Sequence, residues 1–151
     1  MDAERRRLER RLDDPESKAR HIVSLLRSGE IDRFDVELAA AFGNPIARQV
    51  AQQIGVAPPV IASADDILSN LAVTRNDLKF ILYALKNTVP SNLREPRESI
   101  AWALGWAIHS KAEWFQLREV AQTAIEEVIN SIGLEEVLQI LKSAVVPMPL
   151  Q

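Results

Sequence analysis

The residue types that could do chemistry in this chain are concentrated in one stretch, residues 98–115, ESIAWALGWAIHSKAEWF. It holds all three tryptophans and His109, one of the two histidines. His109 and Glu113 are four residues apart, a spacing at which one continuous helix could present two metal ligands. A metal site needs three or four donors, no third ligand lies near them in sequence, and we expect a helix break at Ser110. We therefore predict no metal site.

Carboxylate pairs are the other groups with catalytic potential. Acids at helix starts favour the positive end of the helix dipole, and acids on solvent faces lack the cleft that acid–base catalysis needs. The chain has four such pairs. We assign Asp13-Asp14 and Asp65-Asp66 to helix starts, and Glu126-Glu127 and Glu135-Glu136 to solvent faces. No nucleophile motif or phosphate-binding glycine loop is present. We predict a non-enzyme with no catalytic residue and no cofactor.

Composition limits the class of protein. The 151 residues are 47% hydrophobic and 26% charged, which is typical of one soluble domain. The chain has no cysteine, which excludes disulfides and thiolate zinc sites and fits a cytoplasmic location. No apolar run is long enough for a membrane span. The net charge of −3 makes general nucleic-acid binding unlikely in comparison with protein binding.

Helix start and stop signals follow one another along the chain. Asp14-Pro15 and Asn44-Pro45 are cap-and-proline starts, whereas Gly29, Gly43 and Gly55 are typical helix ends. Asp32 is a further cap, before a helix that bears the apolar residues Phe34, Leu38 and Ala41. Three capping pairs also start helices: Ser63 with Asp66, Thr74 with Asp77, and Ser110 with Glu113.

These signals predict an all-α fold. We expect an irregular bundle of about eight or nine short helices, with stacked helical hairpins of the α-solenoid type as one variant. The domain prediction is a single α-helical domain over 1–151, with a basic helix at 1–13 and a proline-containing tail at 145–151. Residues 56–62, VAPPVIA, should form an extended connector, since a proline disfavours the α conformation in the residue before it.

Residues 24–55 resemble a short helical segment found in bacterial proteins of unknown function. That segment combines a helix, a glycine, an acidic turn, an LAA-x-x-G helix and a proline-started helix. The matching residues here are Gly29, Leu38, Ala39, Ala40, Gly43, Pro45, Ala47 and Arg48. The resemblance covers about a fifth of the chain and implies an α-helical packing module, of the hairpin-repeat (HEAT-like) kind, without catalytic residues.

The helix expected from Pro96 to His109 has two apolar stripes. Ile100, Ala101, Leu104 and Ile108 form one side, while Trp102, Trp106 and His109 lie on nearly the opposite side. Two structures satisfy this pattern. Either the helix is central and buries both faces, or the tryptophans form an exposed aromatic patch for a protein partner or a second copy of the chain.

A second candidate surface is the arginine-rich N-terminus. Residues 1–12 contain five arginines against three acids, whereas residues 112–151 contain two basic residues against six acids. Arg6 and Arg10 could therefore contact an acidic partner or the acidic C-terminal helices of a second copy.

We expect a protein–protein interaction module, such as an adaptor or an immunity- or antitoxin-like protein. Its candidate contact residues are Trp102, Trp106, His109, Arg6 and Arg10. The alternative is a small-ligand-binding helical domain with a tryptophan-lined pocket. Nucleic-acid binding through the arginine-rich N-terminus is the third hypothesis.

Overall fold

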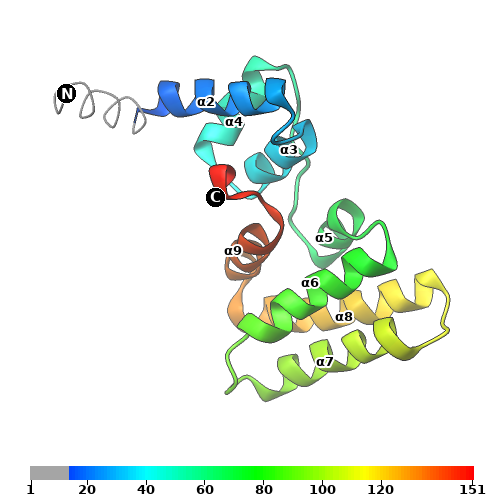
Figure 1. Cartoon of the computed structure of the whole chain (residues 1–151). Coiled ribbons are helices and arrows are strands. Elements are labelled where there is room, and N and C mark those ends of the chain that lie inside the picture. The colour runs from blue at the N-terminus through cyan, green and yellow to red at the C-terminus, as the bar shows by residue number, and fades with distance from the viewer. Residues whose placement is uncertain (1–13) are drawn as a thin grey trace, which may run out of the picture. The chain divides into compact units, whose positions relative to one another are not determined.

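The computed structural model describes residues 14–151, and every regular element in this range is helical. Eight α-helices and one short 3-10 helix follow one another, without a strand among the described residues (Figure 1). The all-α prediction is thus confirmed for this part of the chain. The basic helix predicted at residues 1–13 lies outside the described residues. None of the described helices combines the length and the apolar character that crossing a bilayer requires.

The chain divides into two compact units. Of the described residues, the first contains those from Asp14 to Pro59 together with Val146–Gln151, and the second contains Val60–Val145. The boundary falls inside the predicted connector, and residues 56–62 have no regular structure. The single-domain prediction did not anticipate this division.

The first unit is built from three helices and the C-terminal turn. They are α2 (Pro15–Ser28), α3 (Arg33–Ala41), α4 (Pro45–Gln53) and η1 (Met148–Leu150). Helix α4 packs against both α2 and α3, and η1 contacts α3. The C-terminal segment is therefore part of this unit, although it is far from α2–α4 in sequence.

Local capping explains where these helices begin and end. The Asp32 carboxylate accepts the Asp35 N–H at 3.0 Å, and Asp35 accepts the Asp32 N–H at 3.0 Å. Gly29 ends α2 in the left-handed conformation (φ 78°), as predicted. The predicted stripe of α3 was wrong at Phe34, whose side chain is 49% exposed. Val36, Ala39 and other small residues fill the core instead.

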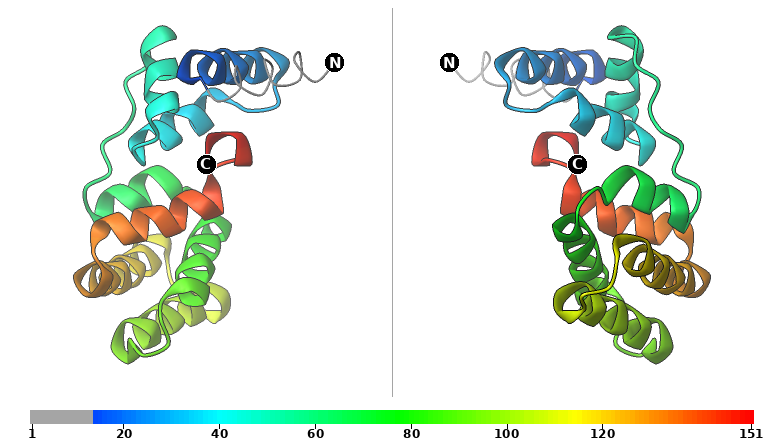
Figure 2. Two further views of the ribbon diagram at one scale, coloured as in Figure 1. Left: turned by 90° about the vertical axis from the view of Figure 1, so that its left-hand side faces the viewer. Right: turned by 90° about the vertical axis from the view of Figure 1, so that its right-hand side faces the viewer.

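The second unit contains the remaining five helices. They are α5 (Ala64–Leu71), α6 (Arg75–Thr88), α7 (Arg94–His109), α8 (Trp114–Ile132) and α9 (Leu134–Val145). Helix α7 packs mainly against α6 and α8, whereas α9 contacts both of these and α5 contacts α8 and α6. Figure 2 shows α7, in yellow-green, at the edge of this unit. Among the described helices of this unit, none packs against one long side of α7.

The break between α7 and α8 lies at Ser110, as predicted. Helix α7 ends at His109 and α8 begins at Trp114. The predicted capping pair of Ser110 and Glu113 was wrong, because Glu113 caps the new helix and its N–H donates to Gln116 Oε1 at 3.2 Å. Ser110 Oγ instead accepts the Ala112 N–H at 2.9 Å inside the turn.

The interior of the described part of the chain is apolar throughout. No polar or charged residue among the described ones is buried. The largest fully buried side chains of the second unit come from all five of its helices: Ile67, Leu68, Leu78, Ile81, Leu82, Leu85, Ile100, Leu117, Ile125 and Leu141. Solenoid-type stacking of helical hairpins stays a prediction.

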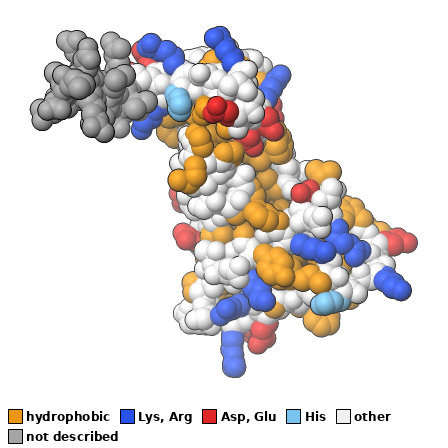
Figure 3. Space-filling model, in the orientation of Figure 1, with side chains coloured by type: hydrophobic (Ala, Val, Ile, Leu, Met, Phe, Trp, Pro, Cys, Tyr) orange, Lys and Arg blue, Asp and Glu red, His pale blue; other side chains and the backbone are white. Residues whose placement is uncertain are grey.

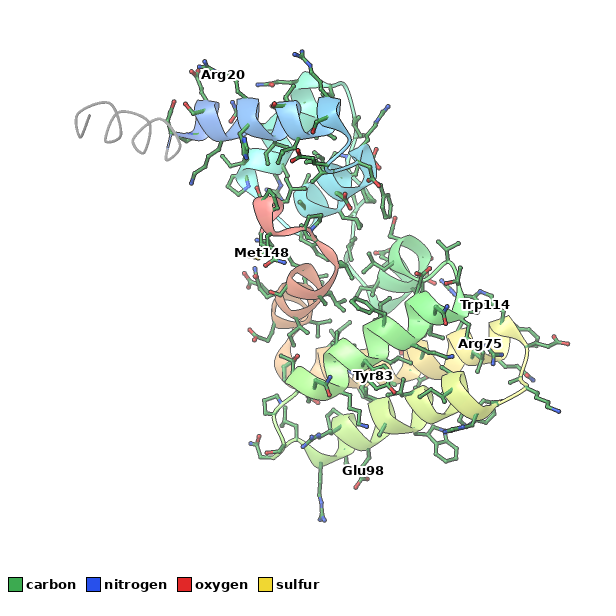
Figure 4. The ribbon with its side chains drawn as sticks, in the orientation of Figure 1. Arg20, Arg75, Tyr83, Glu98, Trp114 and Met148 are labelled. Carbon is green, nitrogen blue, oxygen red and sulfur yellow. The ribbon has the colours of Figure 1, made fainter. Side chains whose placement is uncertain are left out.

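Arg75, at the start of α6, holds the α7–α8 turn in place. Its guanidinium donates to the carbonyl oxygen of Ser110 at 2.9 Å and to that of Ala112 at 3.1 Å (Figure 4). Both carbonyls lie beyond the end of α7, where no helical N–H can reach them. The position at which α7 ends therefore depends on a side chain 35 residues earlier in the sequence.

We expect Arg75→Met to lower the free energy of unfolding by about 1–3 kcal/mol, since two charge-assisted hydrogen bonds are lost from a half-buried site. Chemical denaturation of the full chain measures the change. Lys111→Met is the matched control, because it removes an exposed cation from the same turn and should change stability by less than about 0.5 kcal/mol. Equal effects of the two substitutions would contradict this role for Arg75.

A second prediction concerns Asn44, whose side chain makes two separate contacts. Its Oδ1 accepts the Ala47 N–H at 3.0 Å, and its Nδ2 donates to the Leu150 carbonyl oxygen at 2.7 Å. Asn44→Asp keeps the cap and loses the donor, so we expect a loss of about 1 kcal/mol. Asn44→Ala loses both contacts and should cost about 2 kcal/mol. Denaturation curves that place Asn44→Asp at wild-type stability would show that the contact with Leu150 adds nothing.

Candidate functional site

The outer side of α7 is the candidate site, and it is exposed because the inner side is filled by other residues. Ile100, Ala103, Leu104 and Ala107 are buried against α6 and α8. Helical geometry then places Trp102 and Trp106 on the opposite side, away from these contacts. The Trp102 side chain is 65% exposed, Trp106 is half-buried, and His109 is exposed.

Two-sided burial of α7 was one of the two alternatives that the sequence left open, and it is wrong for Trp102. The expected aliphatic side of α7 also differs from the side that is buried. Ala101 was expected on the buried side and is exposed, while Ala103 and Ala107 are buried instead. Alanine is compatible with either environment, so its position in the sequence did not decide which side faces the core.

The two tryptophans form a pair. Their ring centroids are 6.3 Å apart and their planes are inclined by 52°, a geometry within the range of favourable aromatic contacts. A groove of about 390 Å³ runs alongside the rings, and it is lined by Ala101, Trp102, Gly105, Trp106, His109 and Ser110. The structure thus brings together the three site residues predicted in this helix. The other two predicted contact residues, Arg6 and Arg10, lie outside the described residues.

Gly105 is a site residue that the sequence analysis missed. It lies inside α7 and is absent from the glycines with positive φ, so the backbone does not require a glycine here. A Cβ atom at this position would meet nothing within 4 Å. Glycine inside a helix costs about 1 kcal/mol relative to alanine. Neither backbone conformation nor internal packing accounts for Gly105, and its missing side chain leaves the floor of the groove open.

Charged side chains flank the aromatic pair along α7. Glu98, in the second turn, projects away from the helix (Figure 4). His109 is at the last position of the helix and is exposed. Both ends carry charges of both signs, since Arg94, Glu95 and Arg97 are exposed at the first and Lys111 and Glu113 beyond the last. No group of three potential metal ligands occurs among the described residues.

Concave surfaces also occur elsewhere in the described part of the chain, and two of them are relevant for comparison. One lies between α6 and α9 and includes Phe80 and Tyr83, whose side chains are 53% and 45% exposed. Figure 3 shows hydrophobic side chains, with lysine and arginine around them, over the α6 and α7 part of the second unit. The other is a cavity of about 290 Å³ in the first unit, lined by Lys18, His21, Ile46 and other residues. The tryptophans do not line either of them.

Comparison with known proteins adds no functional information. No protein-family model matches the chain, and no curated protein or solved structure is significantly similar to it. The suspected resemblance of residues 24–55 to a bacterial helical segment stays a prediction. The function must therefore be argued from the groove itself.

We expect Gly105→Ala to raise the free energy of unfolding by about 1 kcal/mol, because the added methyl group improves helix propensity and meets no neighbouring atom. Thermal and chemical denaturation measure this change. The matched control is Gly133→Ala, which should destabilise the chain because Gly133 has a φ of 91°. If Gly105→Ala also destabilised the chain, the glycine would be needed for folding and its link with the groove would be lost.

Proposed function

We propose that this chain is a non-enzymatic protein-binding module and that the Trp102–Trp106 side of α7 is its contact surface. The observation that supports this most directly is the exposure of Trp102, 65%, next to a second tryptophan and an apolar groove. Covering a large apolar ring releases water from it and is favourable by about 25 cal/mol per Å². The rings of this pair therefore provide binding energy that the fold itself does not use.

Tryptophan suits this task for a second reason. It offers a large contact area with only two side-chain torsions, so little conformational entropy is lost when a partner binds. The contact between the two rings restricts both further. The surface is preorganised, which reduces the cost of association. Adaptors and immunity- or antitoxin-like proteins work through surfaces of this kind, and we place the chain in this broad class.

The shape of the groove favours a protein over a small molecule. A small-molecule site is usually concave enough to bury 70–90% of its ligand. The groove beside Trp102 and Trp106 lies along the outer side of a single helix, and all its lining residues come from α7 and the residue after it. A small ligand would be covered from one side alone, whereas a protein surface can cover both rings at once.

Site-specific photo-crosslinking in the cells from which the chain comes tests the proposal. A small diazirine-bearing amino acid at Ala101, inside the groove, should form an adduct with a protein that mass spectrometry identifies. The same amino acid at Gln139, exposed on α9, is the control and should give no such adduct. The adduct at position 101 should disappear when Trp102→Ala is added. Absence of any protein adduct at position 101 would overturn the proposal.

A further inference from the structure

We propose that the protein bound by this side of α7 is a second copy of the same chain, in an antiparallel helix pair around a two-fold axis. This inference rests on the proposed function and names its partner. It is argued from the spacing, size and charge of the residues on the outer side of α7.

The outer side of α7 has the spacing of a helix-pairing seam. Glu98, Trp102, Gly105 and His109 follow one another at intervals of four, three and four residues. This alternation keeps the residues on one side over three turns, as in the contact positions of paired helices. The same four positions lie opposite the buried residues Ile100, Ala103, Leu104 and Ala107, so they point to where α7 has no neighbour.

Residue sizes along this seam are self-complementary. When two copies of α7 run antiparallel, with the axis midway between positions 102 and 105, Trp102 of each copy lies opposite Gly105 of the other. The bulkiest exposed residue of the groove thus faces its smallest, and the second copy would fill the hollow above Gly105. A contact in which one patch meets itself is what two-fold symmetry requires.

Charges along the seam are self-complementary in the same register. Glu98 of each copy lies opposite His109 of the other, so the carboxylate can accept the imidazole N–H. A parallel arrangement would place Glu98 of one copy against Glu98 of the other, which is disfavoured by repulsion. The direction of pairing therefore follows from the positions of Glu98 and His109.

The contact is small. A helix of 16 residues is about 24 Å long, and a fully buried tryptophan covers about 150–250 Å². Trp102 is 65% exposed and Trp106 is half-buried, so the four rings contribute only part of the roughly 1,000 Å² of a small specific interface. We therefore expect a weak, reversible dimer.

Sedimentation equilibrium of the purified full chain, with tryptophan emission recorded at the same concentrations, tests the inference. Mass should rise from one chain to two, and the emission should move to shorter wavelength as the rings are covered. Gly105→Leu fills the hollow meant for Trp102 of the other copy, so this variant should stay monomeric. Gln139→Leu, the control on α9, should dimerise as the wild type does. A wild-type chain that stays monomeric up to about 1 mM would overturn the inference.

A charge-exchange series identifies the register. Glu98→Lys or His109→Glu alone should weaken the dimer about tenfold, because each substitution occurs twice in a symmetric pair. The double variant restores opposite charges and should recover most of the affinity. Within one chain the two positions are 11 residues, or about 16 Å, apart along the helix, so recovery must arise between copies. A double variant weaker than either single variant would rule out the proposed register.

The two proposals fail in different ways. A photo-adduct at Ala101 with a different protein, from a chain that stays monomeric, would overturn the second-copy inference and support the protein-binding function. An adduct of twice the chain mass supports both. A monomeric chain with no protein adduct at position 101 would overturn both.

Discussion

The packing of α7 through its alanines is the constraint on which the candidate site depends. Ala103 and Ala107 are buried against the neighbouring helices, and such small side chains allow helix axes to approach closely. Replacing either alanine by a side chain as large as an indole would overpack this contact. Because the helical repeat places Trp102 and Trp106 away from these alanines, their exposure follows from how the second unit packs. It does not require any special conformation of the tryptophans themselves.

The positions of the helices could be predicted from the sequence because their ends depend on local hydrogen bonds. The capping pair of Thr74 and Asp77 spans four residues, and its N–H and side-chain contacts are made within that span. Gly29 and Gly133 also end helices by a local effect, because each adopts a positive φ that other residues avoid. Where two local caps compete, prediction was wrong, as for Ser110 and Glu113. There the turn between the helices is positioned by Arg75, which is remote in sequence.

The orientation of each helix was harder to predict, because it depends on neighbours that the sequence does not reveal. Phe34 was expected in the core of the first unit and is exposed, since alanines and Val36 fill that space. The aromatic pair could be found as a stripe, whereas its exposure could not, because either side of α7 is apolar enough to be buried. The division into two compact units was not among the predictions for a related reason, and the single domain stays a prediction. Prolines in the connector predict an extended segment and say nothing about which helices pack together.

Gly105 supports the proposed binding surface more strongly than the tryptophans alone. An exposed tryptophan has a simple explanation, since folded proteins leave much apolar area in water. A glycine inside a helix has a cost in stability, and no contact among the described residues requires this one. The hollow that it leaves is next to Trp102 and Trp106. The proposed contact explains both features by one cause, a bulky group of a partner that approaches the α7 backbone. The residue of this chain that fits the hollow, at the register set by the charges, is Trp102 itself.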